Sequence, residues 1–183
     1  IASRICDMEH RGNTWKLLEC NNENRKAIWF CKFTVVAVLM LAAILIQALV
    51  IVAYGNAVGI VEPLPVKTLW EFVLGTAMVT FVVVTIQVFF SLVFANQLVP
   101  MSIGMIGALI GFISTLLPSG IRNILIWGNY AEMMVLGQDT SSGNLQSSEL
   151  VVRNIDFLPL TILFIAGLIA FVLFEKKFQK YEY

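Results

Sequence analysis

Charged side chains are scarce in this sequence. Only 13% of its 183 residues are Asp, Glu, Lys or Arg, whereas 58% are hydrophobic. An average soluble domain carries roughly 25% charged residues. This excess of apolar side chains needs lipid around it, so the composition predicts a membrane protein. The formal net charge is zero, so charge gives no sign of a nucleic-acid partner, and we expect none.

Residues suited to metal binding and hydrolysis are also few. The single histidine, His10, has no second His or Cys at ligand spacing, and the phosphate-binding pattern GxxxxGK(S/T) is absent. Cys6, Cys20 and Cys31 are odd in number and lack a CxxC spacing, so neither a zinc site nor a disulfide framework is expected. These absences indicate a chain that is not itself an enzyme and binds no metal or cofactor of its own.

Four long apolar runs dominate the sequence. They cover residues 33–54, 69–95, 101–117 and 157–174. About 20 apolar residues cross the hydrocarbon core as a helix, and only helices or closed barrels satisfy the backbone there. The sequence therefore predicts an all-α, polytopic membrane helical bundle with four spans. Because the chain begins at Ile1 rather than at a methionine, we expect it to lack an N-terminal part.

The basic residues are distributed unevenly about the four predicted spans. Residues 1–32, the turn at 96–100 and the C-terminal tail fall on one side, where the positive-inside rule predicts the cytoplasm. The loop 55–68 and the region 118–156 then lie outside. Nine of the twelve Lys and Arg residues are on the predicted cytoplasmic side: Arg4, Arg11, Lys16, Arg25, Lys26, Lys32, Lys176, Lys177 and Lys180.

The predicted spans contain no Asp, Glu, Lys or Arg apart from Glu71, near the outer end of the second. Ion-coupled transporters usually place an ionisable group within the membrane, so any active transport would draw its energy from a partner. Two amides, Gln47 and Gln87, lie deep in the apolar runs. A polar side chain in lipid needs a partner. Each amide therefore has two possible partners. One is a substrate or a facing subunit, and the other is a neighbouring helix of the same bundle.

Three glycines gather in the third run, at Gly104, Gly107 and Gly111. Small residues at this spacing let another backbone approach a membrane helix closely. The pattern predicts a tight interface, which is either internal to the chain or between two subunits.

The polar segment before the first span is a candidate docking site. Arg11, Thr14, Trp15 and Leu18 would share one face of a helix by their spacing. Such a helix either docks a cytoplasmic partner or lies on the lipid surface. Gly12, followed by Asn13, weakens a continuous helix at this point.

The same residues carry a family resemblance. The order Asp7-x-Glu9 to Thr14-Trp15-Lys16-Leu17-Leu18, before a long span, resembles the cytoplasmic loop of ABC-2 type permeases. The series Ile86-Gln87, Phe94-Ala95-Asn96 and Pro100-x-x-Ile103-Gly104-x-x-Gly107 resembles them too. Within that superfamily the chain looks most like the permease subunits of lantibiotic immunity transporters, which work with a separate ATPase.

The resemblance implies a function and a set of partners. The four spans would be spans three to six of a six-span permease in the bacterial cytoplasmic membrane, with both ends of this chain cytoplasmic. An ABC ATPase dimer, holding ATP and magnesium, would drive it beside a second permease subunit and expel a peptide antibiotic, giving immunity or resistance. The segment that couples to the ATPase would contain Asp7, Glu9, Arg11, Thr14, Trp15, Lys16 and Leu18.

Two further points stay open on the sequence alone. ABC-2 permeases often follow the fifth span with short re-entrant helices, and residues 118–135 either form these or an ordinary extracellular loop. The function has two alternatives, an ABC-2 exporter of a drug, lipid or polysaccharide, and a membrane scaffold or sensor subunit that transports nothing.

Overall fold

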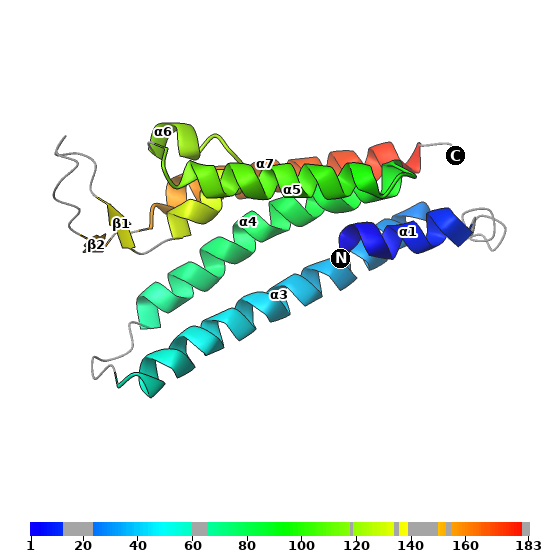
Figure 1. The fold of residues 1–183 in the computed structure, drawn as a ribbon. Coiled ribbons are helices and arrows are strands. Elements are labelled where there is room, and N and C mark those ends of the chain that lie inside the picture. Colours follow the sequence, from blue (N-terminus) through cyan, green and yellow to red (C-terminus); the bar gives the residue numbers. More distant parts are fainter. Residues whose placement is uncertain are drawn as a thin grey trace.

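The computed structural model of the protein describes residues 1–12, 24–59, 66–117, 119–133, 136–138, 150–152 and 155–180. Its long helices lie side by side in an elongated bundle (Figure 1). The helices are α1 (Ala2–Gly12), α3 (Arg25–Ala57), α4 (Val66–Val93), α5 (Leu98–Ser114), α6 (Ser119–Arg122), the 3-10 helix η1 (Trp127–Met133) and α7 (Phe157–Gln179).

One short ribbon departs from the predicted all-helical fold. Strands β1 (Leu136–Gln138) and β2 (Leu150–Val152) pair antiparallel, with Gly137 opposite Val151. The adjacent β-branched side chains of Val151 and Val152 favour extended backbone. The rest of the secondary structure in the described ranges is helical, as the apolar runs predicted.

Three of the described helices, α3, α4 and α7, are long and apolar enough to cross a membrane. The protein is therefore a multi-pass membrane protein. Helix α5 is apolar but has 17 residues, which at 1.5 Å per residue gives about 25 Å. That is slightly less than the roughly 30 Å hydrocarbon core, so four as the number of crossings stays a prediction.

The helix ends differ from the predicted span ends because polar caps, and not only apolar length, set them. Helix α3 begins eight residues before position 33, where the Asn24 side chain accepts a hydrogen bond from the Lys26 backbone N–H at 3.0 Å. At the start of α5 the N-cap residue Gln97 makes no side-chain capping bond, but Asn96 before it accepts a hydrogen bond from the Leu98 N–H at 3.0 Å. The connection from α4, which ends at Val93, to α5, which begins at Leu98, is short and falls at the turn expected at 96–100.

The start of α3 and the ends of α4 and α7 meet at one end of the bundle, which we call the basic end. Trp29 of α3 is fully buried there, with its ring centroid 6.4 Å from Phe89 of α4 and 6.3 Å from Phe178 of α7. Lys26 Nζ lies 3.9 Å from Glu175 Oε1. The described basic residues of these segments are Arg25, Lys26, Lys32, Lys176, Lys177 and Lys180.

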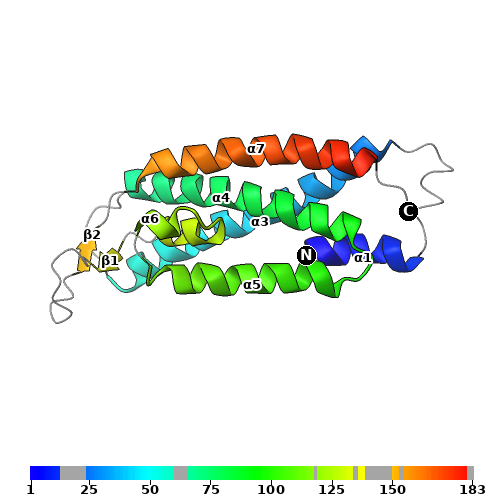
Figure 2. The ribbon, with the colours of Figure 1, turned by 90° about the horizontal axis from the view of Figure 1, so that it is seen from above.

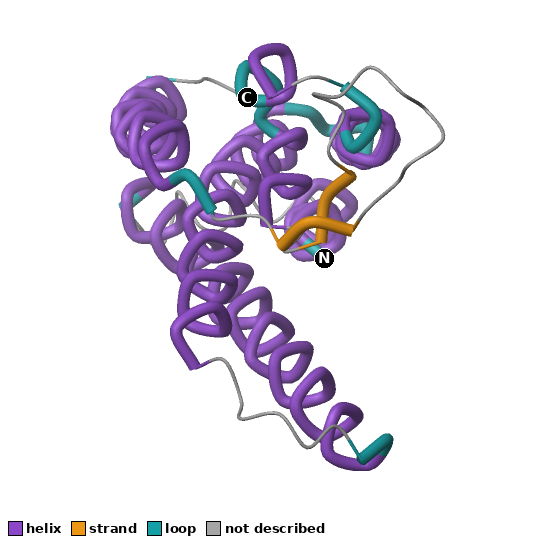
Figure 3. The backbone as a smooth tube through the Cα atoms, turned by 90° about the vertical axis from the view of Figure 1, so that its left-hand side faces the viewer, coloured by secondary structure: helices purple, strands orange, loops and turns teal. Residues whose placement is uncertain are grey.

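At the opposite end, α3 separates from most of the bundle. The buried residues of α3 end at Ala48, and none of those from 49 to 57 is buried. Figures 1 and 3 show this end of α3 projecting away from α5 and α7. The main core therefore lies at the basic end and along the contact of α4 with α7.

Candidate functional site

Helix α1 lies against the bundle at the basic end, beside α3 and α4 (Figure 2). Its apolar face contains Ala2, Ile5 and Cys6, and these pack into the core formed with Trp29 and Phe178. Burial of this stripe explains why a short helix with a polar opposite face is stable here, since most helical stability comes from packing.

Two hydrogen bonds tie α1 to the helices that follow it. Lys32 Nζ, on a buried side chain of α3, donates to the Ile5 carbonyl oxygen at 3.0 Å. Ser3 Oγ donates to the Gln97 carbonyl oxygen at 3.3 Å, in the turn between α4 and α5. A displacement of α1 would therefore act on α3 and on the α4–α5 turn together.

The structure places only part of the predicted coupling segment. Asp7 is 7% exposed and faces the bundle, so any effect of its carboxylate on a docked partner would be indirect. Glu9 and Arg11 lie on the last turns of α1, with side chains outside the described part of the chain. Helix α1 runs to Gly12, and the residue after it lies outside the described ranges. Four coupling residues lie outside the described ranges: Thr14, Trp15, Lys16 and Leu18.

The two buried-amide candidates, Gln87 and Gln47, have different environments. A Cβ built on Gly104 of α5 would lie 3.0 Å from Gln87 Nε2 of α4, so the glycine makes room for this amide. The structure thus brings Gln87 and Gly104 together at a contact between helices. Gln47 is exposed on α3 and lies apart from them.

Trp127 of η1 occupies the rest of the glycine face of α5. A Cβ on Gly107 would overlap the Trp127 indole, and one on Gly111 would lie 3.1 Å from the Trp127 carbonyl oxygen. Of the two interpretations of this face, contact within the chain is the one that the structure contains. Gly107 is seven residues from the end of α5 at Ser114, about 10 Å along the axis.

Helix η1 therefore folds back beside α5 and does not extend away from it, and Figure 2 shows it between α4 and α5. The Tyr130 hydroxyl lies 2.9 Å from Thr80 Oγ1 in the middle of α4. Met133 packs with Val79 of α4 and Leu160 of α7 in a second apolar cluster. This arrangement favours the re-entrant alternative for the segment after α5.

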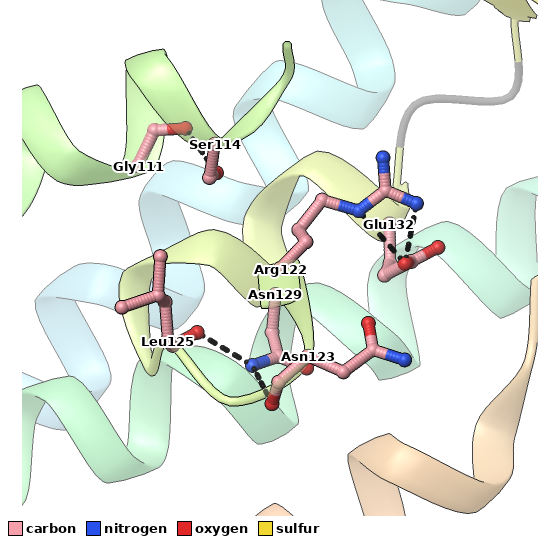
Figure 4. Close-up of polar contacts among 7 residues, drawn as sticks. All are labelled: Gly111, Ser114, Arg122, Asn123, Leu125, Asn129 and Glu132. Atoms are coloured by element: carbon pink, nitrogen blue, oxygen red, sulfur yellow. Dashed lines mark hydrogen bonds and ion pairs between the residues drawn. The ribbon is translucent and has the colours of Figure 1, made fainter. Parts of the chain in front are cut away.

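A buried ion pair, which the sequence analysis did not identify, holds this folded-back segment together (Figure 4). Arg122 donates to Glu132 Oε1 through Nε at 2.8 Å and through Nη2 at 2.5 Å. The two residues are 4% and 6% exposed. The fully buried Asn129 donates from Nδ2 to the Leu125 carbonyl oxygen at 2.8 Å. The sequence does contain an indication of this pair, because Arg122 and Glu132 are the only charged residues from 101 to 138.

In the part of the chain that the structure describes, no group of three or more His, Cys, Asp or Glu side chains is placed to hold a metal ion. What the geometry provides is a helix docked at the basic end, a close contact of α4 with α5, and a rigid element wedged between them near the opposite end.

Comparison with known proteins gives one match. Residues 1–111 match the model of a family described as "ABC-2 family transporter protein". The matched range runs from α1 to Gly111 in α5 and contains every predicted coupling and interface residue. Residues 112–183, with η1 and α7, lie outside it. No curated protein and no solved structure matches the chain.

Proposed function

The chain belongs to the ABC-2 family of transporter proteins, and from this premise we propose that it is a permease subunit that expels a lantibiotic-type antimicrobial peptide from a bacterial membrane. Family membership makes it the membrane component of a transporter, which works in the bilayer with an ABC ATPase and is not itself the catalyst. The peptide substrate, and the immunity or resistance that its expulsion confers, rest on the closer resemblance to lantibiotic immunity permeases.

The attachment of α1 at the basic end is the observation that carries the mechanism. An ATPase dimer that closes on ATP and magnesium would push the segment following α1, with Trp15 and Leu18 as apolar anchors in its surface. Lys32 is hydrogen-bonded to the Ile5 carbonyl oxygen and Ser3 to the Gln97 carbonyl oxygen. A displacement of α1 would therefore be transmitted to α3 and to the α4–α5 turn. A chain with no ionisable group deep in its predicted spans needs such an external source of energy.

The opposite end is built to move as a unit. Trp127 fills the glycine face of α5 and Tyr130 bonds to α4, so α4, α5 and η1 share one contact surface. Packed interfaces of this kind switch between discrete arrangements and do not deform continuously. A push at the basic end would then reorient the outer ends of these helices.

The orientation supports export as the direction of transport. The basic end, with Lys176, Lys177 and Lys180 beside the start of α3, is the cytoplasmic end by the positive-inside rule. Lantibiotics act at the outer face of the membrane, so transfer from the bilayer back to the medium would protect the cell. A second permease subunit, identical or related, would complete the complex on two ATPase subunits.

Growth assays in a sensitive bacterium test this function. The chain would be expressed with its ATPase and any second permease, and the lantibiotic concentration that halves growth would be measured. We expect that concentration to rise several-fold, and the rise to disappear with an ATPase variant that cannot hydrolyse ATP. Protection against an unrelated drug, with none against lantibiotics, would assign the chain to another class of exporter.

A further inference from the structure

An apolar cavity of about 270 Å³ lies between α3, α4 and α7. Thr80 and Val84 are buried at its floor, whereas Leu41 and Leu74 at its rim are 46% and 54% exposed. The cavity therefore opens sideways, between α3 and α4. Its wall also contains Ala37, Ala77, Met78, Phe81 and Phe164.

The chemistry of this wall selects an apolar occupant. Among the described lining residues only Thr80 has a polar side chain, and its hydroxyl is already hydrogen-bonded to the Tyr130 hydroxyl at 2.9 Å. Water in a cavity needs two to four polar partners, and an apolar cavity of roughly 150 Å³ stays dry and binds benzene. The present cavity is larger and equally apolar, so it suits a flexible hydrocarbon chain.

The position of the opening along α4 indicates where the hydrocarbon occupant comes from. The lining residues of α4, from 74 to 84, fall in the middle of Val66–Val93, and α3 and α4 are both long and apolar enough to cross a membrane. A sideways opening at this level meets the hydrocarbon of the bilayer. We propose that the cavity is a binding site for one acyl chain of a membrane phospholipid, which inserts between α3 and α4 and packs on Phe81 and Phe164.

This site goes beyond the proposed transport function. Few residues of α3 outside the basic end are buried, so an acyl chain in the cavity supplies packing between α3 and α4 that the protein alone lacks. Movement of α3 relative to α4 changes the width of the opening. Bound lipid thus favours one spacing of the two helices.

Photo-cross-linking in vesicles tests the site. The intact protein would be reconstituted with a phospholipid that carries a diazirine at mid-chain, illuminated, and mapped by mass spectrometry of its peptides. We expect labelling at Leu41 and Met78 several-fold above that at Val38, an exposed α3 residue outside the cavity wall. Equal labelling of the three positions would show ordinary contact with surrounding lipid and overturn the proposal.

Filling the cavity provides the matched comparison. Ala77→Phe should reduce labelling at Leu41 several-fold, whereas Ala42→Phe, on an exposed part of α3 outside the wall, should leave it unchanged. If Ala77→Phe lowers the protein yield, Ala37→Phe fills the cavity from the opposite wall. Labelling that survives a filled cavity would contradict the proposal. Displacement of the label by a lantibiotic peptide would assign the cavity to the peptide and equally contradict it.

Discussion

Neutralising Glu132 should severely destabilise the half of the protein opposite the basic end. Glu132→Gln keeps the size of the side chain and an acceptor oxygen but leaves the charge of the buried Arg122 uncompensated. Both residues are buried, and the guanidinium nitrogens lie 2.5 and 2.8 Å from the same carboxylate oxygen. Removing one partner of a buried ion pair costs about 3–5 kcal/mol. For a chain of this size, 3 kcal/mol corresponds to a fall in melting temperature of about 6–12 °C.

The pair of Lys67 and Glu71, whose side chains are 89% and 26% exposed, supplies the control. Their charged atoms lie 3.6 Å apart one turn along α4. Solvent screening limits such a pair to about 0.3–0.5 kcal/mol. Glu71→Gln should therefore shift the melting temperature by little, although it makes the same chemical change as Glu132→Gln.

The assay is thermal unfolding of the purified protein in one detergent, for wild type and both variants. A third variant, Arg122→Met with Glu132→Met, should recover most of the lost stability, because apolar residues often replace a buried ion pair without cost. The reasoning is refuted if Glu132→Gln and Glu71→Gln lower the melting temperature equally, or if the double variant is no more stable than Glu132→Gln.

Three further predictions concern packing, topology and coupling. Gly107→Leu should lower the yield of assembled complex far more than Ile106→Leu, because only the first enters the space of Trp127; equal yields would contradict this. A cysteine at Asn144 should react with an impermeant thiol reagent on intact cells, whereas the exposed Cys31 should react only after permeabilisation; labelling of Cys31 from outside would reverse the orientation. Trp15→Ala should weaken ATPase pull-down at matched membrane levels, since losing a buried aromatic anchor commonly costs about 2 kcal/mol or more; unchanged recovery with unimpaired ligand-stimulated ATP hydrolysis would indicate a helix lying on lipid.

The helical fold could be predicted from the sequence because the bilayer imposes one length and one hydrogen-bonding pattern on any apolar run. The ends of the helices could not be predicted in the same way. Asn24 starts α3 well outside the apolar run, since a cap acts through backbone hydrogen bonds and not through hydropathy. The three-residue strands at 136–138 and 150–152 are too short to show a period of two.

The sequence identified several residues of the candidate site but not which of them are in contact. The glycines at 104, 107 and 111 indicate that something approaches α5 closely, but a missing side chain does not specify its partner. Gln87 lies against Gly104 because α4 and α5 form a hairpin, and Trp127 fills the space at Gly107 and Gly111 because the chain folds back after α5. The Arg122–Glu132 pair left a clearer signal, since two opposite charges isolated in an apolar stretch must be paired if both are buried.

Release of a labelled lantibiotic from vesicles tests the central claim most directly. The permease, with its ATPase and any second permease, would be reconstituted with a fluorescent lantibiotic in the lipid, and transfer of the peptide to the medium would be followed after ATP and magnesium are added. The account predicts transfer that depends on ATP hydrolysis and falls sharply with Trp15→Ala. ATP hydrolysis stimulated by the peptide without any transfer would contradict it and indicate a sensor subunit instead.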